Sequence, residues 1–176
     1  MKWLIASDLH GSAECCEMLL DAYEQEGADR LLLLGDILFN GHGAADKEAV
    51  AALLNPLADH ITCVRGNCDS DDDAAMLAFP MEPDYIRIPI GKQAMFATHG
   101  HVYNDTYLPP NMDEGDILLH GHTHVPKTEN RGHYLCFNPG SAAQPLWGSI
   151  RGYMTLDDGV FRWMTLEGEE YRRYEL

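Results

Sequence analysis

Metal-binding side chains recur in five short segments of this 176-residue sequence. The segments are Asp8-Leu9-His10, Gly35-Asp36, Gly66-Asn67-Cys68-Asp69, His99-Gly100-His101 and Gly121-His122-Thr123-His124. Imidazole nitrogen combined with carboxylate and amide oxygen suits divalent manganese, iron, zinc or cobalt without any need for thiolate. The residue types therefore indicate a metal centre with nitrogen and oxygen ligands.

The spacing within the segments supports this interpretation. Asp8 and His10, like His122 and His124, are two residues apart, so both members of each pair point to one side of an extended chain. One segment alone is a weak signal, because an Asp-x-His or a Gly-Asp after a strand is more often an ordinary solvated loop. The occurrence of all five segments in order is what favours metal binding.

The first three segments follow short apolar runs that predict buried strands. These runs are residues 3–6, 31–34 and 61–64. Helices are predicted over 13–26, with Ser12 as N-cap, and over 46–55. Alternating strands and helices are typical of a parallel α/β unit, in which ligands bind where the strands end.

The second half of the chain is richer in strands. Strands are predicted over 86–88, 94–98, 117–119, 134–137, 152–156 and 160–165. Asp157-Asp158-Gly159 is expected to be a hairpin turn between the last two. Parallel strands first and antiparallel strands later predict two packed sheets with helices outside, and residues 1–176 are expected to form a single domain.

Charge and composition limit the partners of the chain. With 28 acidic and 12 basic residues the formal net charge is −16. This charge disfavours extended nucleic acid, but it leaves a small phosphate compound open if cations line the site. No apolar run approaches about 18 residues, and the five cysteines lack a Cys-x-x-Cys pair. We therefore expect no membrane association, free thiols and a cytoplasmic location.

The ordered motifs resemble the signature of the calcineurin-like metallophosphoesterase superfamily. The chain is most similar to the small YfcE-type phosphodiesterases of bacteria and archaea, in its length and in the segments 65–69 and Asn138-Pro139-Gly140-Ser141. The resemblance extends from Asp8 to about Ser141. It implies an α/β fold of two packed mixed β-sheets flanked by helices, and hydrolysis of a small phosphodiester.

The resemblance also implies the ligands of two divalent ions that share Asp36. The first ion would be held by Asp8, His10, Asp36 and His124, and the second by Asp36, Asn67, His99 and His122. Manganese is the metal implied, with iron, zinc, cobalt or nickel as alternatives. A hydroxide bridging the two ions would attack phosphorus in line while the ions offset the developing charge.

One position departs from the family pattern. The residues that the resemblance places at the phosphate are Asn67, Cys68, Asp69 and His101. Many relatives carry a histidine where this chain has Cys68. Because a thiol is a poor hydrogen-bond donor, we expect weak assistance to the leaving group and a preference for activated esters.

Other functions stay open from the sequence. The same site could serve a phosphomonoesterase or a nucleotidase, and the small retromer subunit, a scaffold, resembles this fold. All seven ligand positions are intact, which favours an enzyme because a scaffold has no need to keep them. Asn40, His42 and Arg65 are left open as substrate contacts, and so is a homo-oligomeric state.

Overall fold

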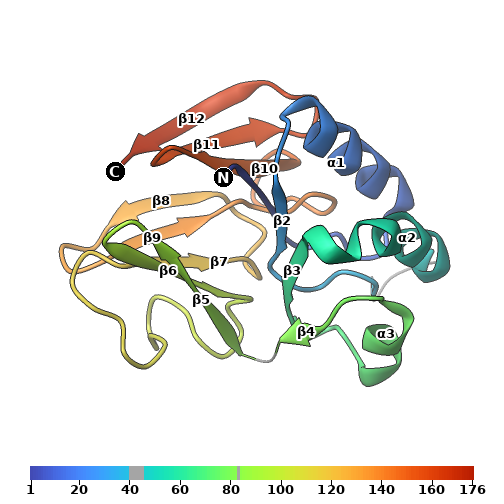
Figure 1. The fold of residues 1–176 in the computed structure, drawn as a ribbon, viewed down its shortest axis with the longest axis horizontal. Helices are drawn as coiled ribbons and strands as arrows, with labels where there is room; N and C mark the ends of the chain where they lie inside the picture. Colours follow the sequence, from blue (N-terminus) through green and yellow to red (C-terminus); the bar gives the residue numbers. More distant parts are fainter. Residues whose placement is uncertain (40–45, 83) are drawn as a thin grey trace.

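The computed structural model describes residues 1–39, 46–82 and 84–176, which form two β-sheets and a few helices (Figure 1). The helices are α1 (Ala13–Gln25), α2 (Lys47–Leu54), the short 3-10 helix η1 (Asn55–His60) and α3 (Asp71–Met76). The strands are β1 (Trp3–Ala6), β2 (Arg30–Leu33), β3 (Ile61–Val64), β4 (Met81–Glu82), β5 (Tyr85–Ile90), β6 (Gln93–Thr98), β7 (Ile117–His120), β8 (Lys127–Asn130), β9 (Leu135–Asn138), β10 (Gly152–Asp157), β11 (Val160–Thr165) and β12 (Glu170–Glu175).

A seven-stranded sheet packs against a five-stranded one, and both are mixed. The strand order is β12-β11-β10-β1-β2-β3-β4 in the larger sheet and β5-β6-β7-β9-β8 in the smaller. Figure 1 shows the helices gathered on one side of the molecule and the five-stranded sheet on the other. The expected fold class, α/β with two packed mixed sheets flanked by helices, is confirmed.

The apolar runs of β1 and β2 are buried on both faces of the larger sheet. Leu4 and Leu31 belong to the core shared with the helices, whereas Ile5 and Leu32 belong to the core between the two sheets. Alternate residues of a strand point to opposite faces, so a strand covered on both faces needs an uninterrupted apolar run. This burial fixes where β1 and β2 end, and thereby where the polar segments begin.

Capping residues set the starts of two helices. The Ser12 hydroxyl accepts a hydrogen bond from Cys15 N at the start of α1, and Ser70 forms a capping box with Asp73 at the start of α3. Helix α3 was not predicted, because it is short and its first turn is entirely acidic. The Ser70–Asp73 capping box is the sequence signal that could have indicated it. No helix in the described part of the chain is long and apolar enough to cross a membrane.

The order of strand types differs from the expectation. The second half is not simply antiparallel, because β6, β7 and β9 pair in parallel in the smaller sheet. The antiparallel strands β10 to β12 instead extend the larger sheet, where Trp3 of β1 pairs with Leu156 of β10. Strands β4, β8 and β12 were not predicted, since they are short or polar. The expected hairpin at residues 157–159 is confirmed.

Candidate metal centre

The five segments come together where strands of both sheets end. Asp8 and His10 follow β1, Asp36 follows β2 and Asn67 follows β3 in the larger sheet. His99 follows β6, while His122 and His124 follow β7 in the smaller sheet. The two sheets therefore each supply part of one cluster, as the ordered motifs indicated.

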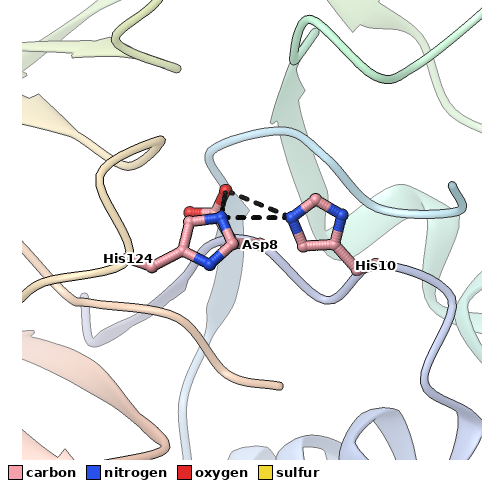
Figure 2. Close-up of side chains that lie close together, drawn as sticks. All are labelled: Asp8, His10 and His124. Carbon is pink, nitrogen blue, oxygen red and sulfur yellow. Dashed lines mark hydrogen bonds and ion pairs between the residues drawn. The ribbon is translucent and has the colours of Figure 1, made fainter. Parts of the chain in front are cut away.

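One group of donor atoms consists of Asp8, His10 and His124, which point toward one another in Figure 2. His124 Nε2 lies 3.2 Å from Asp8 Oδ1 and 3.2 Å from His10 Nε2, and His10 Nε2 lies 3.7 Å from Asp8 Oδ1. Atoms that are each about 2.0–2.2 Å from one ion lie about 3–3.5 Å from one another. The spacing of this group suits a single cation.

The second group centres on Asp36. His99 Nε2 lies 3.4 Å from Asp36 Oδ2 and 3.1 Å from Asn67 Oδ1. Asp36 Oδ2 also lies 3.7 Å from His10 Nε2, so this carboxylate stands between the two groups. This is the position that a bridging ligand requires.

The hydrogen bonds of the histidines show that the cluster fits a cation. Nδ1 of three histidines donates to a main-chain carbonyl oxygen, in the pairs His10–Phe39 (2.7 Å), His99–Leu34 (2.7 Å) and His124–Gln144 (2.6 Å). In neutral imidazole the opposite nitrogen, Nε2, then carries a lone pair. These lone pairs face one another and the carboxylates, and the buried Asp8 Oδ1 accepts no hydrogen bond from the described residues. Such an arrangement is stable with positive charge between the atoms, and anchored imidazoles are typical of metal ligands.

The close approach of carboxylates and imidazoles also shifts their pKa values. Burial favours the neutral form of Asp36, but hydrogen bonding to His99 and the charge of His99 outweigh it and lower the pKa of Asp36 well below its usual value. Burial also favours neutral His99 and His124. The carboxylates beside them outweigh that effect, so Asp36 raises the pKa of His99 and Asp8 raises that of His124. Without metal, the neighbouring carboxylates thus favour the protonated form of His99 and His124.

The backbone of the loops is strained at the predicted ligands. Five of these residues have left-handed φ angles: Asp8 (57°), His10 (46°), Asp36 (54°), His122 (65°) and His124 (58°). Non-glycine residues adopt this conformation rarely, at a cost of roughly 1–3 kcal/mol each, and such strain concentrates at functional sites. The loops therefore hold these side chains at the expense of local stability.

Two glycines leave room for the carboxylates. A Cβ added to Gly66 would lie 2.0 Å from Asp36 Oδ1, and one added to Gly121 would lie 1.9 Å from Ser7 Oγ and 2.8 Å from Asp8 Oδ2. These contacts are too close for any larger residue. The glycines of the motifs thus serve close packing around the centre.

Cys68 faces the centre. Its N–H donates to Asp36 Oδ1 at 2.9 Å, and its sulfur belongs to a group of donor atoms with His10 and Asp36. Burial and then the charge of Asp36 raise the pKa of the Cys68 thiol to about 12, so the thiol is protonated at neutral pH in the metal-free protein.

Asp69 has a different environment from the one expected. Its carboxylate is buried, and it accepts hydrogen bonds from the N–H groups of Asp36 (2.8 Å), Ile37 (2.8 Å) and Gly66 (2.9 Å). These contacts tie the loop after β2 to the loop after β3. Asp69 therefore positions the backbone that carries Asp36, and its role at the phosphate stays a prediction.

His122 and His101 lie at the edge of the cluster. The His122 ring centroid is 5.0 Å from that of His99, and that of His101 is 5.3 Å from His99. Burial, with the nearby His99, lowers the pKa of both. His122 does not join the tight groups of donor atoms formed by the described residues. Both residues are exposed to solvent.

Among the residues left open, Arg65 forms an ion pair with Asp71 at 2.7 Å. Asn40 and His42 lie outside the described residues, so the structure says nothing about them.

The turn at residues 138–141 supports the ligand loops in a way that spacing did not predict. Asn138 Nδ2 donates to Gly121 O at 2.8 Å, and Ser141 Oγ donates to Asp8 O at 2.7 Å. Ser141 Oγ also accepts from Gln144 N, whose carbonyl oxygen anchors His124. In the sequence, the Asn-Pro-Gly-Ser motif indicated only the family resemblance. In the structure, its hydrogen bonds hold the loop that carries Asp8 and the loop that carries His124.

Comparison with known proteins gives the family. Residues 1–158 match the model of the calcineurin-like phosphoesterase superfamily domain. The chain is 39% identical over 174 residues to phosphodiesterase YfcE of Escherichia coli strain K12, covering 96% of this chain and 94% of YfcE. It is 27% identical over 162 residues to the probable metallophosphoesterase YsnB of Bacillus subtilis, covering 89% and 83%.

Solved structures agree with the sequence matches. The Escherichia coli YfcE structure superposes with a TM-score of 0.93 at 36% identity, over 99% of both chains. Vps29 of Entamoeba histolytica, solved with zinc, superposes with a TM-score of 0.67 at 22% identity over 99% of both chains, and shares the fold alone. The chain belongs to the calcineurin-like phosphoesterase superfamily.

Proposed function

We propose that this protein is a metal-dependent phosphodiesterase that hydrolyses a small phosphodiester. The observation that carries the proposal is the convergence of Nε2 atoms of His10, His99 and His124 on the carboxylates of Asp8 and Asp36. The similarity to the phosphodiesterase YfcE supports phosphodiester hydrolysis as the reaction.

Two divalent ions, manganese in the first place, are proposed for the centre. Asp8, His10, Asp36 and His124 would hold one ion, and Asp36, Asn67, His99 and His122 the other. When bound, the ions would activate water and neutralise charge on the phosphate. Ligand type leaves iron, zinc, cobalt and nickel as alternatives to manganese.

The protein's own residues prepare the centre for this chemistry. Asp69 and Ser141 fix the loops that carry Asp36 and Asp8, so the ligand atoms need little rearrangement. The His101 ring borders the exposed side, where its N–H group can donate to a phosphate oxygen. Next to Asp36, the Cys68 thiol would be a weak donor to a departing oxygen, which favours esters with good leaving groups.

The proposed substrate is small. The net charge of −16 repels extended nucleic acid, while a single phosphodiester can be attracted by bound cations. All five cysteines are free thiols, which supports a reducing compartment such as the cytoplasm.

A panel assay tests the proposal. Protein depleted of metal and then reloaded with manganese should hydrolyse bis(4-nitrophenyl) phosphate with a higher kcat/KM than 4-nitrophenyl phosphate. His99→Ala should remove this activity, whereas His133→Ala, which changes an exposed histidine, should retain it. A preference for the monoester would replace the proposal with the phosphomonoesterase alternative, and inactivity of the loaded protein on every ester would refute an enzymatic role.

A further inference from the structure

A highly exposed tryptophan lies in a turn that contacts the backbone of His124. Trp147 is 92% exposed, whereas Trp163 is fully buried. Its neighbours Leu146 and Ile150 are also exposed. Single exposed apolar residues are common and need no function. Two further features indicate that Trp147 does have a function.

The backbone conformation at Trp147 is unusual for a tryptophan. Trp147 and Gly148 have φ angles of 54° and 75°, and Ser149 N donates to Leu146 O at 3.0 Å. Two successive left-handed residues closed by such a bond form a type I′ turn, which prefers Asn, Asp or Gly at its first central position. A bulky residue there is strained, and strain of this kind is concentrated at functional positions.

The turn is also fastened to a predicted metal ligand. His124 Nδ1 donates to Gln144 O at 2.6 Å, while His124 O accepts from Leu146 N at 3.4 Å and from Ser149 Oγ at 3.1 Å. Trp147 directly follows Leu146, whose N–H contacts His124, and consecutive Cα atoms are about 3.8 Å apart. The residues that flank Trp147 thus hold the ring and the backbone of His124, and Trp147 lies at the exposed tip of the same turn.

The inner part of the site is polar. Its carboxylates, imidazoles and amide suit cations and phosphate oxygens, and they offer little apolar surface for the organic part of an ester. An exposed indole supplies such a surface, since aromatic rings and bases stack on tryptophan largely irrespective of their substituents.

We propose that Trp147 is a specificity-determining residue, which packs its indole against an aromatic or nucleobase-like ester group of the substrate. This inference rests on the proposed function and narrows it to phosphodiesters that carry a flat π-face. It makes Trp147 a substrate contact outside the metal centre.

Competitive inhibition by two phosphonates tests the inference. Phenylphosphonate and methylphosphonate share the anionic group and differ in the organic one. The unmodified protein should bind phenylphosphonate more tightly. Trp147→Asn should reduce this preference about 2- to 10-fold, by raising Ki for phenylphosphonate alone. Trp147→Phe should retain most of the preference.

Fluorescence gives a reading that needs no turnover. Trp147 is the most accessible indole, so phenylphosphonate should shield it from acrylamide quenching while methylphosphonate should not. The shielding should disappear in Trp147→Phe. Asn also suits the left-handed backbone, so Trp147→Asn should keep or raise Tm, which separates lost recognition from lost folding.

The matched control is Tyr171→Asn, which removes an exposed aromatic residue from the edge strand β12 and should change neither Ki. The inference is overturned if Trp147→Asn leaves the Ki ratio unchanged, raises both Ki values equally, or changes only the oligomeric mass. Activity of the unmodified protein on bis(4-nitrophenyl) phosphate reports separately on the proposed function.

Discussion

The Asp36 side chain lies between both groups of donor atoms. Its Oδ2 is 3.4 Å from His99 Nε2 and 3.7 Å from His10 Nε2, and its Oδ1 accepts from Cys68 N. A carboxylate so placed can share its charge between two cations. A neutral amide cannot do this equally well.

Replacing this charge gives the first prediction. Asp36→Asn should abolish diester turnover and deplete both metals, because the neutral amide bridges two cations poorly. Elemental analysis and kcat measure the two effects together. Asp21→Asn, at an exposed position of α1, is the matched control and should change neither. Two metals per chain with near-normal turnover in Asp36→Asn would contradict the bridging role.

Residue 68 is proposed to lie near the leaving group. The Cys68 sulfur forms a group of donor atoms with His10 and Asp36, and its thiol is neutral in the metal-free protein. Imidazolium at the same place would be a charge-assisted donor. Asp69 is not free to orient it, because its carboxylate accepts from backbone amides.

Cys68→His should therefore raise kcat for diesters with alkyl leaving groups by about 10-fold, below the ~10²–10⁴-fold typical of well-oriented general acids. The gain should shrink for a nitrophenyl leaving group, which departs without protonation. Cys68→Ala provides the control, since it removes the thiol without adding a donor. No gain on either ester, with normal metal content, would show that residue 68 does not reach the departing oxygen.

At the scale of elements, the loops after the strands hold the ligands at positive φ and in close contact. Gly66 leads out of β3 and lies against the Asp36 carboxylate of the neighbouring loop. Asp69 joins the same two loops through backbone amides. The distance between Asp36 and Asn67 therefore depends on how closely two backbones approach.

Gly66→Ala should disrupt this approach. The added Cβ would lie 2.0 Å from Asp36 Oδ1 and 2.3 Å from Asp36 N, so the loops must separate. We expect a loss of metal affinity of at least about 10-fold, as for other residues that orient ligands, measured by calorimetric titration with manganese. Gly27→Ala, where nothing lies within 4 Å, should cost only its left-handed strain of about 1 kcal/mol and leave affinity unchanged. Equal affinities in the two variants would refute the packing argument.

At the scale of the molecule, two apolar cores support the fold independently of the centre. One lies between the larger sheet and the helices, and the other between the sheets, where Phe137 contacts Trp163 edge to face at 5.3 Å. A chain of this length buries roughly two-thirds or more of its unfolded surface. We therefore expect the protein to fold without metal.

Chelation should remove activity without unfolding the protein. The far-ultraviolet circular dichroism at 25 °C should be unchanged. The Tm should fall by about 5–10 °C relative to protein at manganese near 100 times its Kd, as expected for a ligand that binds only the native state. Loss of the dichroism signal on chelation would show instead that the metal is structural.

The pH dependence of the chelated protein follows from its histidines. Neighbouring carboxylates raise the pKa of His99 and His124, whereas burial lowers that of His101, His120 and His122. A raised histidine pKa gives stability that is full below the unfolded value of about 6.5 and is lost as pH rises through the folded pKa. The histidines with lowered pKa reduce the stability of the folded state only as the pH falls below about 6.5. From pH 6.5 to 8, only the first effect operates.

The Tm of the chelated protein should thus fall between pH 6.5 and 8, while that of the manganese form should not, because bound cations replace the protons. Thermal scans across this range measure both. His99→Ala should weaken the fall, whereas His133→Ala should not. A flat profile in the chelated protein would show that the imidazoles do not bind protons beside Asp8 and Asp36.

The sequence alone predicted the candidate ligand residues that the structure brings together and the strands that precede them. The run Leu31 to Leu34 predicts a strand buried on both faces, because side chains alternate between the two faces and each of them must then be apolar. Asp36 follows the end of that run. The paired motifs 8/10 and 122/124 showed their chemistry because ligand types are few and their spacing is local. These signals depend on neighbouring residues, so they can be read directly.

Tertiary structure decided what depends on contacts distant in sequence. The placement of β10 beside β1 brings residue 156 to residue 3, and no local pattern encodes that choice. Asp69 accepts hydrogen bonds from backbone amides of a loop 33 residues away, a contact that the motif alone did not predict. Likewise, Ser149 in the turn of Trp147 contacts the backbone of His124, 25 residues away. Hydrogen bonds between loops and the packing of sheet on sheet act between remote segments, and for that reason only the folded chain determines them.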